Sequence, residues 1–484
     1  MSSVVFNIKI VHTNDVHGRL LYDEANKFIG ASRLSGYVSK LRAENRNILL
    51  IDAGDILHGQ TIVTLSKGKV AAEVMNLVGY NYFVPGNHDF NYGYQRLLEL
   101  TKSMKFDVLS ANIVFLNGKF PFKRNDIIKI DDKKIGIFGL TTPETSIKTN
   151  PQNTKEIIFI DPIKAANKEI IELRKKDVDL IIAITHLGVD NESFGHRSYD
   201  LRDKTLGIDL IIDGHSHTKL KKIDQIINRA TIVSTGAYLE YVGIVDLSII
   251  DGAKIINPES IHFDNFKSQK PDPVVERFVK KASSEVSHLL DKIVGRTQIY
   301  LEGKKSAVRT RETHLTKIIT DAVKKETGAD VVFLNGGSFR SSINPGNITM
   351  NDVVSVSPFS NFIVTKKIKG SKILQMLELG LGKYPFPTGG FPQIAGMQCF
   401  FDPGLEFDSR VKVVKIDDVP MKCESEYIIA TNDFISCGGD GYGMVKNCKE
   451  IKKYSELDGI LARYFPIISP IGADNLSARI IAKI

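Results

Sequence analysis

Five short apolar runs in the first half of the chain each end directly in a cluster of polar residues. The runs cover residues 6–11, 48–51, 82–84, 180–184 and 210–212. Continuous apolar, β-branched runs of this length are typical of strands that are buried on both faces. Stretches with the apolar spacing of helices, such as residues 32–45 and 162–176, alternate with these strands. The alternation predicts an α/β fold with buried sheets.

The polar clusters stand where folds of this class bind ligands, at the carboxyl ends of strands. Residues two apart on an extended backbone project to the same face, so Asp15 with His17 and His215 with His217 can each reach one point. We therefore expect the polar side chains of all five clusters to meet at one site. The candidates are Asp15, His17, Asp55, Asn87, His186, His215 and His217.

Carboxylate, imidazole and amide groups in this combination indicate a site for divalent metal ions. Seven donors exceed the needs of one tetrahedral site, whereas two ions about 3.5–4 Å apart with a bridging carboxylate would use them all. A water or hydroxide shared by such ions is a good nucleophile near neutral pH, and it would attack phosphorus in line. His88 is placed to stabilise the transition state or to protonate the leaving oxygen. We interpret His12 and His58 as structural.

The 484-residue chain is long enough for two or three domains. A polar segment at residues 266–273 contains two prolines, and an amphipathic helix is predicted over residues 274–292. A second α/β unit then follows, with a helix at 312–328 and a strand at 330–334. We predict a metal-binding domain at 1–265, a linker helix at 266–293 and a nucleotide-binding domain at 294–484.

The second half contains the components of a nucleotide site. Arginine binds phosphate with two parallel N–H groups, and an aspartate can accept hydrogen bonds from ribose hydroxyls. Aromatic rings stack on bases, each stack contributing about 1–3 kcal/mol if values for single-stranded nucleic acids apply. Taken singly, each phenylalanine is more typical of a core. The candidates are Arg309, Asn335, Arg340, Phe359, Asn361, Phe434 and Asp440.

Composition argues against several other classes of protein. The net charge is +8, and the lysine and arginine residues are scattered along the sequence rather than clustered in a basic stripe. A nucleic-acid polymer is therefore not an expected partner. No apolar run approaches ~18 residues, so no membrane association is expected. The four cysteines form no CxxC pair, which favours reduced thiols. Since no secretory signal is visible, we expect a cytoplasmic location; a secreted or periplasmic one would require a leader.

The ordered polar clusters resemble those of the calcineurin-like metallophosphoesterases, and the run His12-Thr-Asn-Asp-Val-His-Gly18 is similar to the 5′-nucleotidase family. The second half resembles the C-terminal domain of the same family, so the resemblance covers nearly the whole chain. It implies a four-layer α/β/β/α domain with a dimetal site, joined by a linker helix to an α/β substrate domain. It also implies that the substrate domain swings about residues 266–295. The matching motifs are Asp15-x-His17, Gly54-Asp55, Gly86-Asn-His-Asp89, His186 and Gly214-His-Ser-His217.

The same resemblance implies roles for individual residues. One ion (Zn, Mn, Co or Mg) would be held by Asp15, His17, Asp55 and His217, and a second by Asp55, Asn87, His186 and His215. His88 would be catalytic. Asn91 stands where the family usually has an aspartate that stabilises the imidazolium, and Ser338-Phe339 replaces glycine and isoleucine in the substrate domain. The seven candidates in the second half would grip the nucleotide.

These observations predict a hydrolase that converts nucleoside 5′-monophosphates to nucleoside and phosphate, a reaction of nucleotide catabolism, as a monomer or homodimer. Because Asn91 is similar to the 2′,3′-cyclic-nucleotide 2′-phosphodiesterase/3′-nucleotidase branch, that activity is one alternative. A UDP-sugar or dinucleotide pyrophosphatase is another within the same fold. A third alternative is a nucleotide-binding protein whose catalysis is weak because of Asn91.

Overall fold

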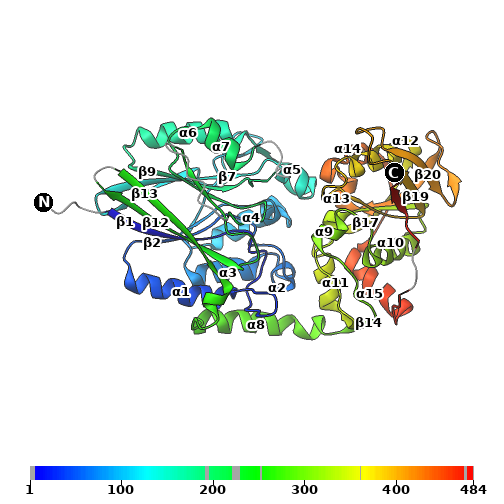
Figure 1. The fold of residues 1–484 in the computed structure, drawn as a ribbon, viewed down its shortest axis with the longest axis horizontal. Coiled ribbons are helices and arrows are strands. Elements are labelled where there is room, and N and C mark those ends of the chain that lie inside the picture. Colours follow the sequence, from blue (N-terminus) through cyan, green and yellow to red (C-terminus); the bar gives the residue numbers. More distant parts are fainter. Residues whose placement is uncertain are drawn as a thin grey trace. The chain divides into compact units, whose positions relative to one another are not determined.

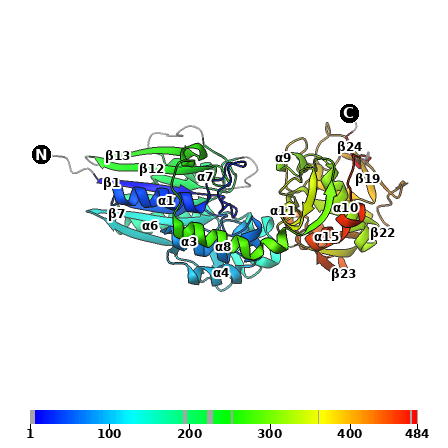
Figure 2. The same ribbon diagram turned by 90° about the horizontal axis from the view of Figure 1, so that it is seen from below.

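The computed structural model describes residues 6–190, 196–220, 229–250, 253–359, 361–473 and 477–482. The chain forms two compact units, Met1–Glu285 and Val286–Ile484, which we call the N-terminal and C-terminal units (Figures 1 and 2). The division lies within helix α8 (Pro273–Leu290), which was predicted at residues 274–292. The domain limits at residues 265 and 294 stay a prediction. Within the described residues, no helix is both long enough and apolar enough to cross a membrane.

Two mixed sheets form the centre of the N-terminal unit. In the first sheet, four neighbouring strands are parallel and a β-hairpin extends one edge. Its order is β13 (Ala253–His262), β12 (Tyr241–Ile250), β1 (Phe6–Thr13), β2 (Ile48–Asp52), β3 (Tyr82–Phe83) and β4 (Asp107–Val108). The second sheet has the order β11 (Thr231–Val233), β10 (Leu210–Asp213), β9 (Leu180–His186), β7 (Lys133–Thr141) and β6 (Asn125–Ile130). All of its neighbouring strands are parallel except the pair β6–β7.

Helices cover the outer faces of both sheets. Alternate strand residues such as Ile10, Ile51 and Ile182 fill the core between the sheets. The outer face of the first sheet packs against α1 (Gly30–Glu44), α3 (Lys69–Val78), α4 (Tyr94–Ser103) and α8. The outer face of the second sheet packs against α6 (Pro162–Arg174) and α7 (Ser198–Lys204). This order of layers, visible in Figure 1, confirms the predicted α/β/β/α architecture.

Local sequence explains where these elements begin and why they are buried. All seven residues of β9 are buried, as expected for a parallel strand covered on both faces. Helix α6 begins at Pro162 because the Asp161 carboxylate accepts hydrogen bonds from the backbone N–H groups of Ile163 and Lys164. Both elements lie where the apolar pattern predicted them.

A five-stranded sheet organises the C-terminal unit, and it is packed on both faces. Strand β15 (Val331–Asn335), predicted at 330–334, directs Val332 and Leu334 into one core and Val331 and Phe333 into another. The first core contains α10 (His314–Thr327) and α15 (Leu457–Ile468), and the second contains α12 (Gly370–Leu381). The sheet order is β18 (Pro392–Ala395), β15, β22 (Glu426–Asn432), β17 (Phe362–Lys369) and β23 (Lys449–Glu456).

The remaining elements are shorter. The second core also contains residues of a four-stranded sheet with the order β21 (Val419–Pro420), β20 (Val411–Ile416), β19 (Met397–Phe401) and β24 (Ile480–Ala482). Two small ribbons pair β14 (Ile293–Thr297) with β16 (Gly346–Thr349) and β5 (Ile113–Phe115) with β8 (Ile157–Phe159). The other α-helices are α2 (Thr61–Leu65), α5 (Thr145–Lys148), α9 (Lys305–Val308), α11 (Met350–Val356), α13 (Asp433–Ser436) and α14 (Gly443–Lys446).

Candidate metal centre

The seven candidate metal ligands lie at the carboxyl ends of five parallel strands of the N-terminal unit. Asp15 and His17 follow β1, Asp55 follows β2, Asn87 follows β3, His186 ends β9, and His215 and His217 follow β10. Five of them are less than a tenth exposed, whereas His215 and His217 are partly exposed. Both sheets therefore contribute ligands to the same edge of the unit, as the positions of the strand ends predicted.

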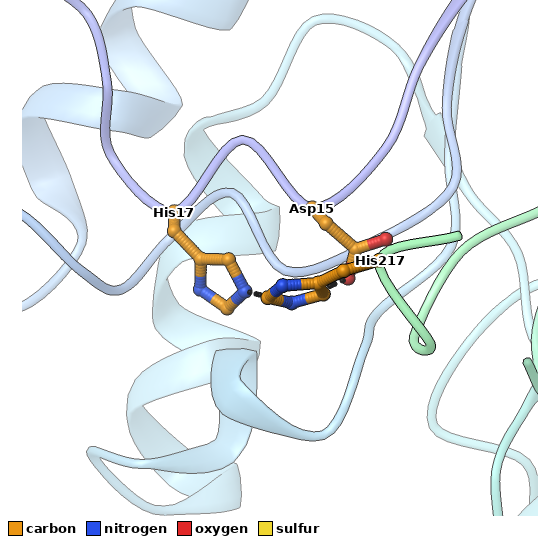
Figure 3. A group of neighbouring side chains, drawn as sticks. All are labelled: Asp15, His17 and His217. Carbon is orange, nitrogen blue, oxygen red and sulfur yellow. Dashed lines mark hydrogen bonds and ion pairs between the residues drawn. The ribbon is translucent and has the colours of Figure 1, made fainter. Parts of the chain in front are cut away.

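One group of candidate ligands consists of Asp15, His17 and His217, whose ligand atoms lie within 4.8 Å of one another. Nε2 of His17 is 2.9 Å from Nε2 of His217, and Nε2 of His217 is 3.6 Å from Oδ1 of Asp15. Figure 3 shows the two imidazoles facing one another with the Asp15 carboxylate beside His217. Two imidazole nitrogens and a carboxylate oxygen that converge in this way form a donor set suited to a divalent ion.

A second group consists of Asp15, Asp55 and His186. Nδ1 of His186 donates to the Ala53 carbonyl oxygen (2.7 Å), so Nε2 carries the lone pair of the neutral ring. Nε2 is buried 3.3 Å from Oδ2 of Asp55 and 4.0 Å from Oδ1 of Asp15, and it makes no hydrogen bond with any described residue. A lone pair that faces two carboxylates in a buried site requires a positive charge between them, and a metal ion satisfies this requirement.

The pKa shifts of Asp15, Asp55 and His186 also indicate that this group requires a positive charge. Burial raises the pKa of Asp15 to about 7. Burial by itself would lower the pKa of His186, but the carboxylates of Asp55 and Asp15 outweigh it and raise this pKa to about 10. In the same way, His186 and His88 overcome the effect of burial on Asp55 and hold the pKa of its carboxyl well below the usual range. Without a metal ion, a proton on His186 would have to supply the missing charge.

Asn87 and His215 adjoin the second group and introduce a residue that the sequence analysis missed. Nδ1 of His215 is 2.9 Å from Oδ1 of Asn87, and its Nε2 is 2.7 Å from Oε2 of the buried Glu144. A carboxylate on the second nitrogen of a ligating histidine fixes the orientation of the ring. Glu144 follows β7, so it is a further polar residue after a strand end, and that position was the available signal. The allocation of ligands to two separate ions stays a prediction.

The neighbours of the His88 ring include Asn91 and, unexpectedly, His58. Thr149 Oγ1 donates to Oδ1 of Asn91 (2.9 Å), which directs the Asn91 amide nitrogen to Nδ1 of His88 (3.1 Å). The neutral His88 ring therefore carries its proton on Nε2. His58, interpreted as structural, stacks on His88 with ring centroids 5.8 Å apart and an interplanar angle of 14°. Nδ1 of His58 also contacts the Tyr92 hydroxyl (2.8 Å), so His58 is part of the surroundings of His88.

The backbone at the candidate ligands corrects one step of the sequence argument. Asp15 and His17 were expected on an extended segment, but β1 ends at Thr13 and their φ angles are 50° and 46°. The left-handed conformation also occurs at Asp55, His215 and His217, with φ angles of 63°, 86° and 55°. Alternation along a strand is therefore not what brings these side chains together. Residues in this conformation are uncommon outside glycine, and such strain concentrates at functional sites.

The candidate nucleotide residues form two contact groups within the C-terminal unit. Asn335, at the end of β15, donates to Oδ2 of Asp440 (2.8 Å), and Asn432 donates to Oδ1 of Asn335 (3.1 Å). The Ser338 hydroxyl, in a position where glycine was expected, extends this network to Asn335 and Asn432. The guanidinium of Arg340 lies 5.0 Å from the centre of the Phe359 ring.

Three other candidates have separate positions in the same unit. Phe434 is 9% exposed, belongs to the second core and packs on Gly439, so only a small part of its surface is accessible for base stacking. The carbonyl oxygens of Arg309 and Asn361 accept hydrogen bonds from the backbone N–H groups of Thr388 and Leu457. The proposed contacts of all seven residues with a nucleotide stay a prediction.

Comparisons with known proteins agree with this architecture. Residues 8–219 match the calcineurin-like phosphoesterase family, and residues 293–447 match the 5′-nucleotidase C-terminal domain. The chain is 30% identical to a 5′-nucleotidase of Diplobatis ommata over 91% of this chain and 84% of the relative. It is 29% identical to the human 5′-nucleotidase over 91% and 85% of the two chains.

Two further comparisons concern a bacterial relative and a solved structure. The trifunctional nucleotide phosphoesterase protein YfkN of Bacillus subtilis is 29% identical over 91% of this chain, which spans 32% of that relative's length. Among solved structures, a 5′-nucleotidase precursor of Thermus thermophilus superposes with a TM-score of 0.85 at 26% identity over 99% of both chains. The family expected from the sequence motifs is confirmed. This chain belongs to the 5′-nucleotidase family of phosphoester hydrolases.

Proposed function

We propose that this chain hydrolyses nucleoside 5′-monophosphates to a nucleoside and inorganic phosphate. The observation that carries the proposal is the convergence of buried imidazole and carboxylate groups from strand ends of both sheets, which Asp15, Asp55 and His186 exemplify. Membership of the 5′-nucleotidase family supports the choice of a nucleotide as the substrate.

In this proposal, Asp15, His17, Asp55 and His217 hold one divalent ion, and Asp55, Asn87, His186 and His215 hold the second. Oδ2 of Asp55 lies 3.3 Å from Nε2 of His186 and 3.8 Å from Nε2 of His17, which supports Asp55 as the shared ligand. Nitrogen and oxygen donors of this kind suit Zn²⁺, Mn²⁺, Co²⁺ or Mg²⁺. When bound, such ions neutralise phosphate oxygens and lower the pKa of water.

His88 is the proposed proton donor. Asn91 donates to Nδ1 of the neutral ring, so Nε2 is the nitrogen available to the leaving group. The form that would protonate the leaving nucleoside oxygen is the imidazolium, which would give up its Nε2 proton and return to the neutral ring. Its Nδ1–H would require the Asn91 amide to turn and present its oxygen. The stack against His58 limits rotation of the ring and holds that proton in a constant direction. The backbone N–H of His88 also donates to Oδ1 of Asp55 (2.8 Å), which fixes the proton donor relative to the proposed shared ligand.

The C-terminal unit is the proposed nucleotide-binding unit. Asp440 is oriented by the hydrogen bond from Asn335, and its carboxylate is suited to accept hydrogen bonds from ribose hydroxyls. Phe359, which is only partly buried, would stack on the base. Arg309 and Arg340 would bind phosphate oxygens through their guanidinium groups. Asn361 and Phe434 complete the proposed set.

A substrate panel with product separation tests the proposal. The purified chain is incubated with AMP, 3′-AMP, 2′,3′-cyclic AMP and UDP-glucose, with added Mn²⁺ or with EDTA. Nucleoside and nucleotide products are separated by chromatography, because ring opening of 2′,3′-cyclic AMP and cleavage of UDP-glucose release no free phosphate. We expect AMP to have the highest kcat/KM with Mn²⁺ and no turnover with EDTA. Asp55→Asn is the matched control and should be inactive because it removes the charge of the shared ligand. Metal-independent phosphate release, or no phosphate release from AMP, would contradict the proposal.

A second candidate activity is hydrolysis of 2′,3′-cyclic nucleotides, and the contact between Asn91 and His88 favours it. An amide in place of a carboxylate gives less stabilisation of an imidazolium, so the protonation step differs from that expected for the family. The similarity to a trifunctional nucleotide phosphoesterase is compatible with a broader substrate range. A higher kcat/KM for 2′,3′-cyclic AMP than for AMP would establish this activity instead.

A further inference from the structure

We propose that Tyr238, braced by Arg19, is a positioning residue that holds His17 and His217 in place and thereby sets the affinity of the ion they bind. The inference rests on the proposed function only in taking these two histidines as metal ligands. It concerns two residues of the N-terminal unit that lie beside the first ligand group and that the mechanism above does not use.

The backbone of Tyr238 is held in an unfavourable conformation. Its φ angle is 64°, and that of the next residue, Leu239, is 58°. Left-handed backbone is rare for bulky side chains and is retained where the surrounding structure enforces it. The Tyr238 N–H donates to the carbonyl oxygen of Asp15 (2.8 Å), so this conformation ties the loop between β11 and β12 to the loop that carries Asp15 and His17.

The Tyr238 ring contacts both histidines of the first group. Its centroid lies 5.4 Å from that of His217, at an interplanar angle of 80°, and 5.7 Å from that of His17. The edge-to-face contact with His217 and the tilted contact with His17, at an interplanar angle of 52°, restrict the rotation of both imidazoles. His217 is partly exposed, so solvent alone would leave its ring several orientations. Tyr238 thus favours the orientation in which the two Nε2 atoms face one another.

Arg19 also packs on the Tyr238 ring. The guanidinium carbon lies 4.6 Å from the Tyr238 ring centre and 5.6 Å from that of Phe28, within the range of a cation–π interaction. Nη1 of Arg19 donates to the His17 carbonyl oxygen (2.7 Å). Nε of Arg19 is buried and makes no hydrogen bond within the described part of the chain. The side chain therefore joins the backbone of one candidate ligand to the ring that packs on both.

The experiment distinguishes a role of the Tyr238 ring in ion affinity from a role in the stability of the fold. Tyr238→Gly removes the ring and, because glycine adopts a φ of 64° readily, also removes the strain. In calorimetric titrations of the metal-free protein with Mn²⁺, we expect one of the two ions to bind about 10- to 100-fold more weakly. The thermal unfolding midpoint of the metal-free protein should stay equal or rise. Tyr238→Phe should keep both affinities, and Arg19→Leu should weaken the same ion to a smaller extent.

Lys67→Gly is the matched control. Lys67 is exposed and has a φ of 47°, so glycine relieves similar strain there, and both Mn²⁺ affinities should stay at wild-type values. Two Mn²⁺ affinities within about twofold of wild type in Tyr238→Gly would overturn the inference. So would a parallel loss of Mn²⁺ affinity and of the metal-free midpoint, which would make Tyr238 only a support of the fold. A wild-type chain that binds no Mn²⁺ would also overturn it.

The same titrations distinguish this inference from the proposed function. A wild-type protein that binds two Mn²⁺ ions and releases no phosphate from any nucleotide would refute the proposed function. The role of Tyr238 in ion affinity would still be decided by the glycine variant.

Discussion

Replacement of His12 by phenylalanine should remove a pH dependence that a buried imidazole imposes on folding. The His12 side chain is 1% exposed within β1, and a methyl group on Gly243 would lie 2.0 Å from its Nε2. Its Nδ1 is buried without a hydrogen-bond partner among the described residues. Burial therefore lowers the pKa of His12 from 6.5 to about 3.

The sign and size of the effect follow from proton linkage. Between these two pKa values the unfolded chain binds a proton that the native protein does not. Protonation of His12 therefore has almost no effect on the free energy of unfolding above pH 6.5, and it lowers this free energy increasingly as the pH falls below 6.5. At about pH 5 the loss is RT ln(1 + 10^1.5), or about 2 kcal/mol relative to neutral pH. Since this pH is well above the native pKa, the loss hardly depends on the exact native value.

Urea unfolding of the N-terminal unit in EDTA, at about pH 7.5 and 5, measures this loss. Wild type should lose about 2 kcal/mol more than His12→Phe between the two conditions, because phenylalanine has no proton to bind. Any change in packing by the larger ring is independent of pH and cancels in the double difference. Ile10→Val, a neighbouring core change without a titrating group, should lose as much as wild type. Equal losses in wild type and His12→Phe would refute the reasoning.

Three further predictions concern the candidate metal centre. Glu144→Ala should weaken one Mn²⁺ by about 10- to 100-fold in calorimetric titration, since the neighbouring imidazole loses its carboxylate, whereas Glu144→Gln keeps an acceptor and should lose less. Asn91→Asp should raise kcat for AMP about tenfold or more in a phosphate-release assay, because a carboxylate facing His88 Nδ1 stabilises the imidazolium. An unchanged kcat would contradict the proton-donor role of His88. Gly86→Ala should abolish Mn²⁺ binding, while the circular dichroism spectrum stays native, because the alanine Cβ would lie 2.3 Å from Oδ1 of Asp55. Retained Mn²⁺ binding would contradict this prediction and show that the loop can relax.

The fold could be predicted because a strand that is buried on both faces has a continuous run of apolar residues in the sequence. Strands β2, β9 and β10 are fully buried, and each appears in the sequence as an uninterrupted apolar run that stops one or two residues before the strand ends. The polar residues after these runs then lie at one edge, because parallel strands end there. The convergence of Asp55, His186 and His215 was predictable for this reason, without knowledge of any side-chain distance.

The parts of the site that were missed depend on contacts between segments that are distant in the chain. Glu144 is 71 residues from His215, and nothing in its local sequence indicates that partner. His58 was interpreted as structural because no pattern predicts its stack on His88. Tyr238 was not considered, since its position depends on a left-handed backbone that its own residue type disfavours. Sequence patterns describe strands well and describe such loops poorly.

Strain and electrostatic repulsion are concentrated in the same loops, and this coincidence has a physical consequence. Five candidate ligands have left-handed backbone. Burial, together with repulsion from the Asp55 carboxylate, raises the pKa of both Asp15 and Asp89 to about 7. The metal-free site therefore disfavours its own geometry, and the two packed sheets beneath it must hold the loops in place. A site prepared in this way needs little reorganisation when an ion binds. Substitutions that relax these loops should consequently stabilise the metal-free chain while they weaken its affinity for metal, which is the opposite of what a purely structural loop would show.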